Sequence, residues 1–137
     1  MAVTANLITL PGLVAGADLS AAQYLFVKFA STAPQVKPVA ASTDAAFGVL
    51  QNDPKSGEEA EVAIGGLAKV VAGTSVGWTA GGAVGWNTTG QAVPIAFDST
   101  TTDNTLIGGI FPLLSGQGTV AAGQIISVQL LPGALRG

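Results

Sequence analysis

Two side chains on which many enzymes depend are missing from this sequence. Its 137 residues include no histidine and no cysteine, and only 9% of them are charged, whereas about 25% is usual for a globular domain. Histidine and cysteine supply proton transfer, nucleophilic attack and metal ligation near neutral pH. Without cysteine, neither disulfides nor thiolate metal sites can form. The composition therefore indicates a binding or building protein rather than an enzyme, and we expect no cofactor.

Clustered positive charge and long apolar runs are also absent. The formal net charge is −3. The five cations lie far apart in the sequence, at Lys28, Lys37, Lys55, Lys69 and Arg136. Nucleic-acid binding needs cations gathered along a phosphate track, so we expect none. No apolar run is long enough to span a bilayer, and residues 1–6 lack the basic residue of a secretory signal. We therefore expect no membrane partner.

Apolar residues, by contrast, are abundant. They make up 48% of the chain, and the mean hydropathy is +0.53. A length of 137 residues predicts one domain. A small domain with so few charges tends to adhere to its neighbours. We therefore expect other subunits to cover part of its surface.

Short strands separated by turn residues account for most of the chain. Aromatic and branched residues, or apolar–polar alternation, mark the candidates. These are residues 24–29, 36–39, 47–51, 59–64, 67–72, 83–87, 92–97, 106–114 and 124–131. The turn 87–90 should join two of them in a hairpin, and Pro132-Gly133 should end the last one. The predicted fold is all-β, a small β-barrel or β-sandwich.

The first 17 residues look different from the rest. They hold Pro11-Gly12 and only one short apolar stretch, residues 7–10. We expect an extended N-terminal arm over residues 1–17 and a single β-rich domain over 18–137. A helix from Asp18 to Phe26, capped by Asp18, is the alternative for the start of the domain. A strand is favoured there because aromatic and branched residues accumulate from Tyr24 onward.

A small turn device recurs at unequal spacing. Residues 19–24 resemble residues 120–125, and residues 78–83 are a looser copy. Each copy is an apolar residue, a turn of small residues and the start of a strand. The unequal spacing excludes a solenoid repeat, so we expect a tight turn that is reused before strands.

The candidate chemical sites each have a simpler structural explanation. Asp53, Glu58, Glu59 and Glu61 could form a weak calcium site, but their spacing fits no calcium loop, and a solvated turn is favoured. The loop 98–105 holds hydroxyls and acids, and an enzyme could use Asp98 or Asp103. No base is available to activate a nucleophile there, so a polar loop is favoured.

The two tryptophans raise a further alternative. Trp78 and Trp86 could form a platform for a carbohydrate, as in a carbohydrate-binding module or a fibre-type virion protein. Large aromatic residues more often anchor a core or an interface, so packing is favoured.

The order of segments in the middle of the chain resembles that of a known family. The Gly-Val-Leu of residues 48–50 precedes a short acidic loop, Gly-Glu-x-x-x-Val follows at 57–62, and Gly-x-x-Lys-Val at 66–70. The stretch 84–94 ends in Ala-Val-Pro, and residues 107–109 and 123–128 also fit. Over residues 44–131 the chain resembles the small head decoration, or cement, proteins of tailed phages.

This resemblance implies a function without catalytic residues. Such a protein is made in the host cytoplasm, binds the outer surface of the capsid and holds neighbouring copies of the major capsid protein together. It commonly forms a homotrimer at the local three-fold axes. We expect the arm to supply a docking strand and three large aromatic residues to act as anchors. The predicted interface residues are Leu7, Ile8, Leu10, Leu13, Trp78, Trp86 and Phe111.

Overall fold

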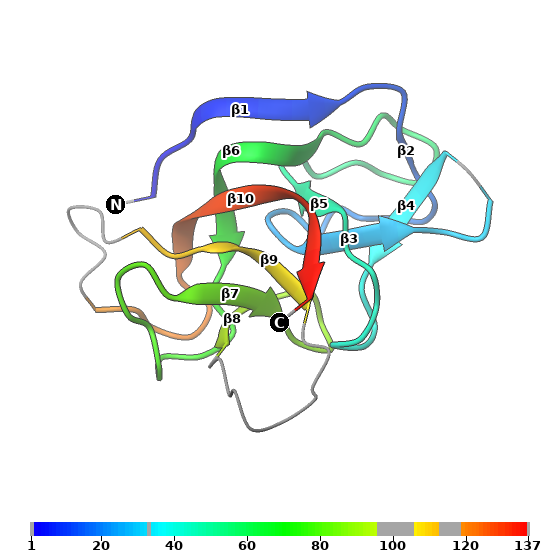
Figure 1. Ribbon diagram of the computed structural model, residues 1–137. Coiled ribbons are helices and arrows are strands. Elements are labelled where there is room, and N and C mark those ends of the chain that lie inside the picture. The colour runs from blue at the N-terminus through cyan, green and yellow to red at the C-terminus, as the bar shows by residue number, and fades with distance from the viewer. Residues whose placement is uncertain (1, 33, 96–105, 113–118, 137) are drawn as a thin grey trace.

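The computed structural model describes residues 2–32, 34–95, 106–112 and 119–136 (Figure 1). Within these residues every regular element is a β-strand, which confirms the all-β prediction. The strands are β1 (Ala5–Leu10), β2 (Val14–Ala15), β3 (Phe26–Phe29), β4 (Gln35–Pro38), β5 (Gly48–Leu50), β6 (Val62–Val71), β7 (Ala83–Trp86), β8 (Ala92–Ile95), β9 (Leu106–Ile110) and β10 (Ile125–Arg136). No helix in the described ranges has the length and apolar character to cross a membrane.

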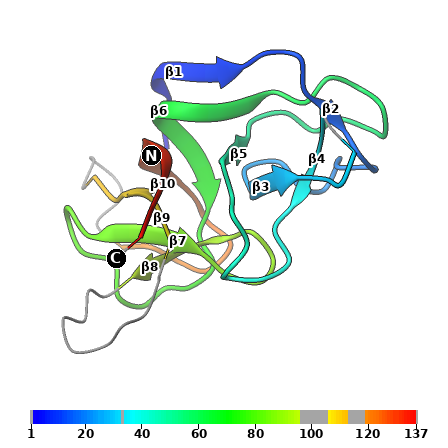
Figure 2. The same cartoon turned by 45° about the vertical axis from the view of Figure 1, so that its right-hand side comes forward.

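One continuous sheet contains all ten strands. Its order is β2-β4-β3-β5-β6-β10-β9-β7-β8, with β1 added on β6. The strand pairs are antiparallel except for β2 with β4. A parallel bridge between Ala72 and Ala92 then connects β8 back to the end of β6. The five strands β6, β10, β9, β7 and β8 therefore curl round on themselves like a small barrel (Figures 1 and 2).

The apolar side chains form two clusters inside this sheet. The larger cluster lies within the curled part, where the rings of Phe26 and Trp86 meet with centroids 5.2 Å apart. Gly108 leaves room for these rings, since a side chain there would overlap Phe26. The smaller cluster joins β2, β3, β4 and β5 through residues such as Leu13, Val36 and Leu50.

Several predicted elements occur where the sequence placed them. β7 and β8 form the expected hairpin, with Ala83 opposite Ile95 and Trp86 opposite Ala92. The helix proposed from Asp18 to Phe26 does not form. The chain turns there instead, and the strand begins at Phe26.

Two expectations about strand ends are wrong. Residues 59–64 and 67–72 were predicted as separate strands, but Val62–Val71 is one strand that passes through Gly65-Gly66. β10 also continues past Pro132 to Arg136. Its pairing with β9 shifts register between Leu130 and Leu135, so Pro132 lies at an irregularity where its missing N–H costs no regular ladder bond.

The recurring turn is present before β7 and β10. The N–H of Gly82 donates to the carbonyl of Thr79, and the N–H of Gln124 donates to that of Ala121, at 2.9 and 3.0 Å. In both copies the residue before the donor is a glycine with positive φ, 76° at Gly81 and 86° at Gly123. Glycine is favoured there because it adopts this backbone conformation without steric cost.

Candidate interaction surface

One face of the curled sheet carries apolar side chains on its solvent side. Along β10, Ile126 and Val128 are fully buried, whereas Ile125 and Gln129 are exposed. Strand alternation explains this pattern, since successive side chains point to opposite sides of a sheet. Ile125 remains 42% exposed, although an apolar side chain of this size gains free energy from burial.

The strand register extends this face over neighbouring strands. Gln129 lies opposite Leu67 on β6 and opposite Ile110 on β9. Ile110, which is 37% exposed, lies in turn opposite Ala83 on β7. Residues directly opposite one another in a ladder project to the same side of a sheet. The outward row therefore crosses from β6 to β7 through β10 and β9.

The N-terminal segment covers part of the same face. The Ser127 hydroxyl is fully buried and lies 2.7 Å from both the N–H and the carbonyl oxygen of Val3. This pair of hydrogen bonds holds the segment before β1 on β10. Val3 itself is 40% exposed, so it adds another apolar side chain to the surface. The buried Ser127 hydroxyl thus fixes the exposed apolar residue Val3 in place.

Lys69 supplies the charge of this face. It lies opposite Ser127 on β6, is half-buried and forms no ion pair within the part of the chain that the structure describes. None of the described carboxylates lies on β6, β9 or β10. We call this surface the β10 face, and its members are Val3, Lys69, Ile110, Ile125 and Gln129.

The predicted arm residues are distributed from solvent to core. Ile8 is 55% exposed on β1, Leu7 and Leu10 are half-buried, and Leu13 is buried in the smaller cluster. β1 pairs with its own β6, from Leu10 opposite Val62 to Ala5 opposite Leu67. The arm therefore lies against its own domain, and Ile8 is the arm residue most available to a partner.

The predicted aromatic anchors lie mostly inside the molecule. Trp86 and Phe111 are 4% and 1% exposed and belong to the larger core cluster. Trp78 is half-buried, packs on Phe111 with ring centroids 5.1 Å apart and donates from Nε1 to the Thr74 carbonyl at 2.7 Å. A carbohydrate platform built from both tryptophans is not present, because Trp86 is not accessible.

The acidic segment before β6 forms a hydrogen-bonded turn. The Asn52 side chain donates to the Glu59 carbonyl and accepts from the Glu61 N–H, both at 2.9 Å, and the Lys55 N–H donates to Glu58 at 2.7 Å. The carboxylates are exposed. Within the described ranges, no group of three acidic residues is arranged to hold a metal ion. The loop with Asp98 and Asp103 lies outside the described residues.

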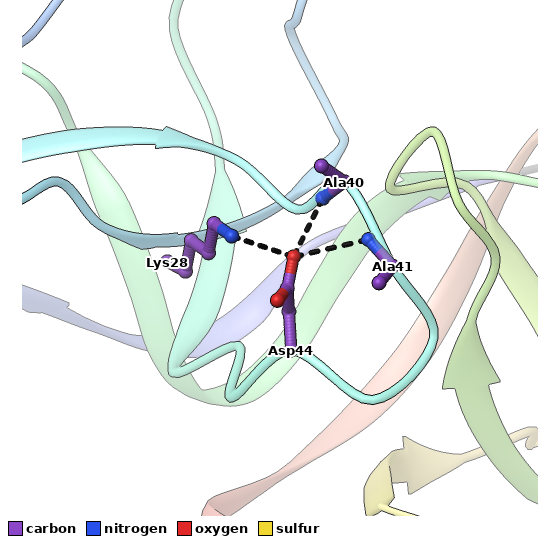
Figure 3. Close-up of polar contacts among 4 residues, drawn as sticks. All are labelled: Lys28, Ala40, Ala41 and Asp44. Carbon is purple, nitrogen blue, oxygen red and sulfur yellow. Dashed lines mark hydrogen bonds and ion pairs between the residues drawn. The ribbon is translucent and has the colours of Figure 1, made fainter.

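A second charged group is structural. Asp44 accepts hydrogen bonds from Lys28 Nζ at 2.6 Å and from the N–H groups of Ala40 and Ala41 at 2.8 and 3.0 Å (Figure 3). The hydrogen bond from Lys28, followed by that from Ala40, lowers the pKa of Asp44 below its usual value. Because these bonds join β3 to the loop after β4, the carboxylate holds that loop in place.

Comparison with known proteins identifies the kind of molecule to which this surface belongs. A family model described as phage cement protein matches residues 15–125. The chain belongs to this family. The predicted resemblance is therefore confirmed, and the match begins further towards the N-terminus than the segments from which it was inferred. The protein is a structural component of a phage capsid. No curated protein matches the chain.

A solved structure of similar shape comes from another phage. It is the crystal structure of the head fiber gp8.5 N base in bacteriophage phi29, with a TM-score of 0.60 and 17% sequence identity. The match covers 96% of this chain and 99% of that chain. At this identity the likeness shows a shared fold. This chain thus has the same fold as the N base of the phi29 head fiber.

Sequence reasoning missed most of the β10 face. Val3, Ile110 and Ile125 were not singled out, because an exposed apolar residue and a buried one look the same in a strand of unknown orientation. The alternation in residues 124–131 carried a usable signal, since the polar Ser127 and Gln129 lie two positions apart among branched apolar residues. The register across β9 and β10, which brings Ile110 beside Gln129, required the structure.

Proposed function

We propose that this protein binds the outer surface of a tailed-phage head as a homotrimer and cements neighbouring copies of the major capsid protein. The family match, which covers most of the chain, carries this proposal. The role is one of binding rather than catalysis, and it agrees with a sequence that has no histidine and no cysteine. The outer capsid surface is the proposed location in the virion.

The form of the molecule supports a cementing role. A single sheet in which β8 is bridged back to β6 makes a compact body, and the β10 face offers apolar area to a partner. Specific interfaces bury about 1,600 Å² in total. Repeating moderate contacts over a shell gives avidity without strong single contacts. A protein that binds only the assembled lattice also stabilises it, by about 2.7 kcal/mol per site at a free concentration of 100 Kd.

Capture by shells tests this proposal. Purified protein is mixed with heads of the parent phage that lack it, the heads are sedimented, and the bound protein is quantified. We expect saturable binding to these heads and little binding to heads that already carry their full complement. We also expect the temperature at which the heads rupture to rise with occupancy. Protein that stays in the supernatant at all concentrations would refute the cementing role.

The fold match supports a second candidate. Because the chain shares its fold with the N base of a head fiber, it could serve as the base of a projecting structure rather than as a lattice clamp. The rupture temperature of saturated heads separates the two. A clamp at every local three-fold axis should occupy all equivalent sites and raise the rupture temperature, whereas a fibre base should leave the rupture temperature unchanged.

A further inference from the structure

We propose that copies of this chain associate head to tail, with the β10 face of one copy against the β1 surface of the next. The β1 surface consists of Ile8, Thr9 and Glu61, all of which are exposed. The inference rests on the proposed trimer and adds the surfaces that build it. It concerns contacts between copies of the chain.

The charged residues of the two surfaces lie towards opposite ends of one strand. Ile8 packs over Gly65 in the first half of β6, and Glu61 directly precedes this strand. Lys69 lies near the other end of β6 and is flanked by Ile125, which pairs with Val71. Both views show β6 running from the side of β1 and β2 towards β7 and β8 (Figures 1 and 2). Glu61 and Lys69 therefore lie towards different ends of β6.

The two surfaces complement each other in charge and in polarity. Lys69 is a cation without an ion pair among the described residues, in a face without carboxylates. Glu61 is an exposed anion just before β6, four residues along the chain from Gly65, which pairs with the exposed Ile8. Within one copy, Glu61 and Lys69 do not form an ion pair with each other. A second copy can supply both the opposite charge and the apolar contact.

The charge of the whole chain favours this choice of surfaces. Each copy carries a net charge of −3, so most approaches bring carboxylates towards carboxylates. The β10 face is a place where a second copy meets one cation and no described acid. A contact between two different surfaces is heterologous, and it generates a closed ring when the rotation between copies closes. Three copies related in this way form a trimer.

Two single variants of exposed apolar residues test the β10 face. Ile125→Asp places a charge in the face, whereas Val76→Asp places the same charge at a site that is 74% exposed and lies in the loop after β6. Light scattering after size exclusion should give three times 13.5 kDa for the wild type and for Val76→Asp. Ile125→Asp should give the mass of one chain. A cooperative thermal transition in all three proteins confirms folding.

Charge reversal tests the partner surface. Lys69→Glu and Glu61→Lys should each raise the dissociation constant of the oligomer about tenfold or more at low salt, because each brings like charges together. The double variant restores opposite charges at every contact and should recover most of the wild-type affinity. Lys37→Glu, an exposed change on β4, is the control and should leave the mass unchanged.

Three results would overturn the inference: a wild type that is monomeric at micromolar concentration, an Ile125→Asp protein that assembles like the wild type, or a double variant that is as weak as its parents. Shell capture is measured in parallel. An assembled wild type that does not bind heads would refute the proposed function and leave the inference standing. Variants that stay trimeric and bind heads would refute the inference and leave the proposed function standing.

Discussion

At the scale of single residues, β1 and β6 approach each other closely at a glycine. Gly66 has φ +83°, and a side chain there would overlap the carbonyl oxygen of Asn6. Asn6 also has positive φ, 49°, which asparagine tolerates better than most residues. The two residues form an irregular step in the β1–β6 ladder, where the register shifts.

We therefore expect Gly66→Ala to destabilise the protein. The cost combines the left-handed backbone, about 1–2 kcal/mol, with displacement of β1, about 1–3 kcal/mol. Gly57→Ala is the matched control, because Gly57 has φ +82° and open space around it. Urea unfolding should show a larger loss for Gly66→Ala than for Gly57→Ala. Equal losses would mean that the contact between Gly66 and Asn6 costs nothing to break.

The carboxylate of Asp44 gives a prediction about acid. Lys28 and two backbone N–H groups lower its pKa in the folded state. A group with a lowered pKa stabilises the fold above its unfolded value, about 4, and this contribution is lost as the pH falls through the folded pKa. The wild type should therefore lose stability as the pH drops below about 4, and part of that loss should be due to Asp44.

Urea unfolding at several pH values measures this contribution. Asp44→Asn should be less stable than the wild type at neutral pH and should lose less on acidification, because asparagine does not titrate. Lys28→Gln removes the largest cause of the shift but keeps the bonds from Ala40 and Ala41, so its acid profile should be intermediate. If Asp44→Asn and the wild type have parallel profiles, the carboxylate does not contribute.

At the scale of elements, β1 is less buried than β6, the strand with which it pairs. The structure describes six apolar residues before Leu13, yet within the strand itself only Leu7 and Leu10 are partly buried. The hydrogen bonds of Ser127 to Val3 add a second attachment. Beyond Pro11-Gly12, the buried Leu13 begins the core.

Deleting residues 1–12 should therefore leave a folded domain of lower stability. Two half-buried leucines and the bonds to Ser127 together contribute about 2–4 kcal/mol. Circular dichroism and urea unfolding should show a cooperative transition at a lower midpoint. The truncated protein should also bind heads more weakly, because Ile8 is lost. Removal of residues 1 and 2 alone is the control. Undiminished capture of the longer deletion would exclude β1 from binding.

The same scale shows why some elements could be predicted from sequence and others could not. The β7–β8 hairpin was predictable because its turn residues and flanking apolar runs are local signals. The continuity of β6 through Gly65-Gly66 was not, since two glycines usually indicate a break. In the fold, Gly66 is required by the close approach of Asn6, a residue 60 positions earlier in the chain. No local pattern contains that information.

At the scale of the whole molecule, composition was enough to predict the class of protein, whereas the strand register determined which residues form the exposed surface. The scarcity of charge and the lack of histidine and cysteine indicated a binding protein of β-strands, and the family resemblance indicated a phage head. The aromatic residues chosen as anchors illustrate the limit of composition. Trp86 and Phe111 have the right chemistry for an interface, but long-range pairing of β7 and β9 places them in the core.

The low charge of the chain also shapes how a shell component of this kind must work. A few exposed apolar side chains, such as Ile8, Ile110 and Ile125, give one copy only modest affinity for another. In the proposed assembly on a closed lattice, every copy would be held by several neighbours at once, and dissociation would require all of these contacts to open together. Because the proposed contacts between copies are mostly apolar, screening by salt should weaken only the part that Lys69 and Glu61 contribute. The proposed assembly should therefore keep most of its affinity as the ionic strength changes.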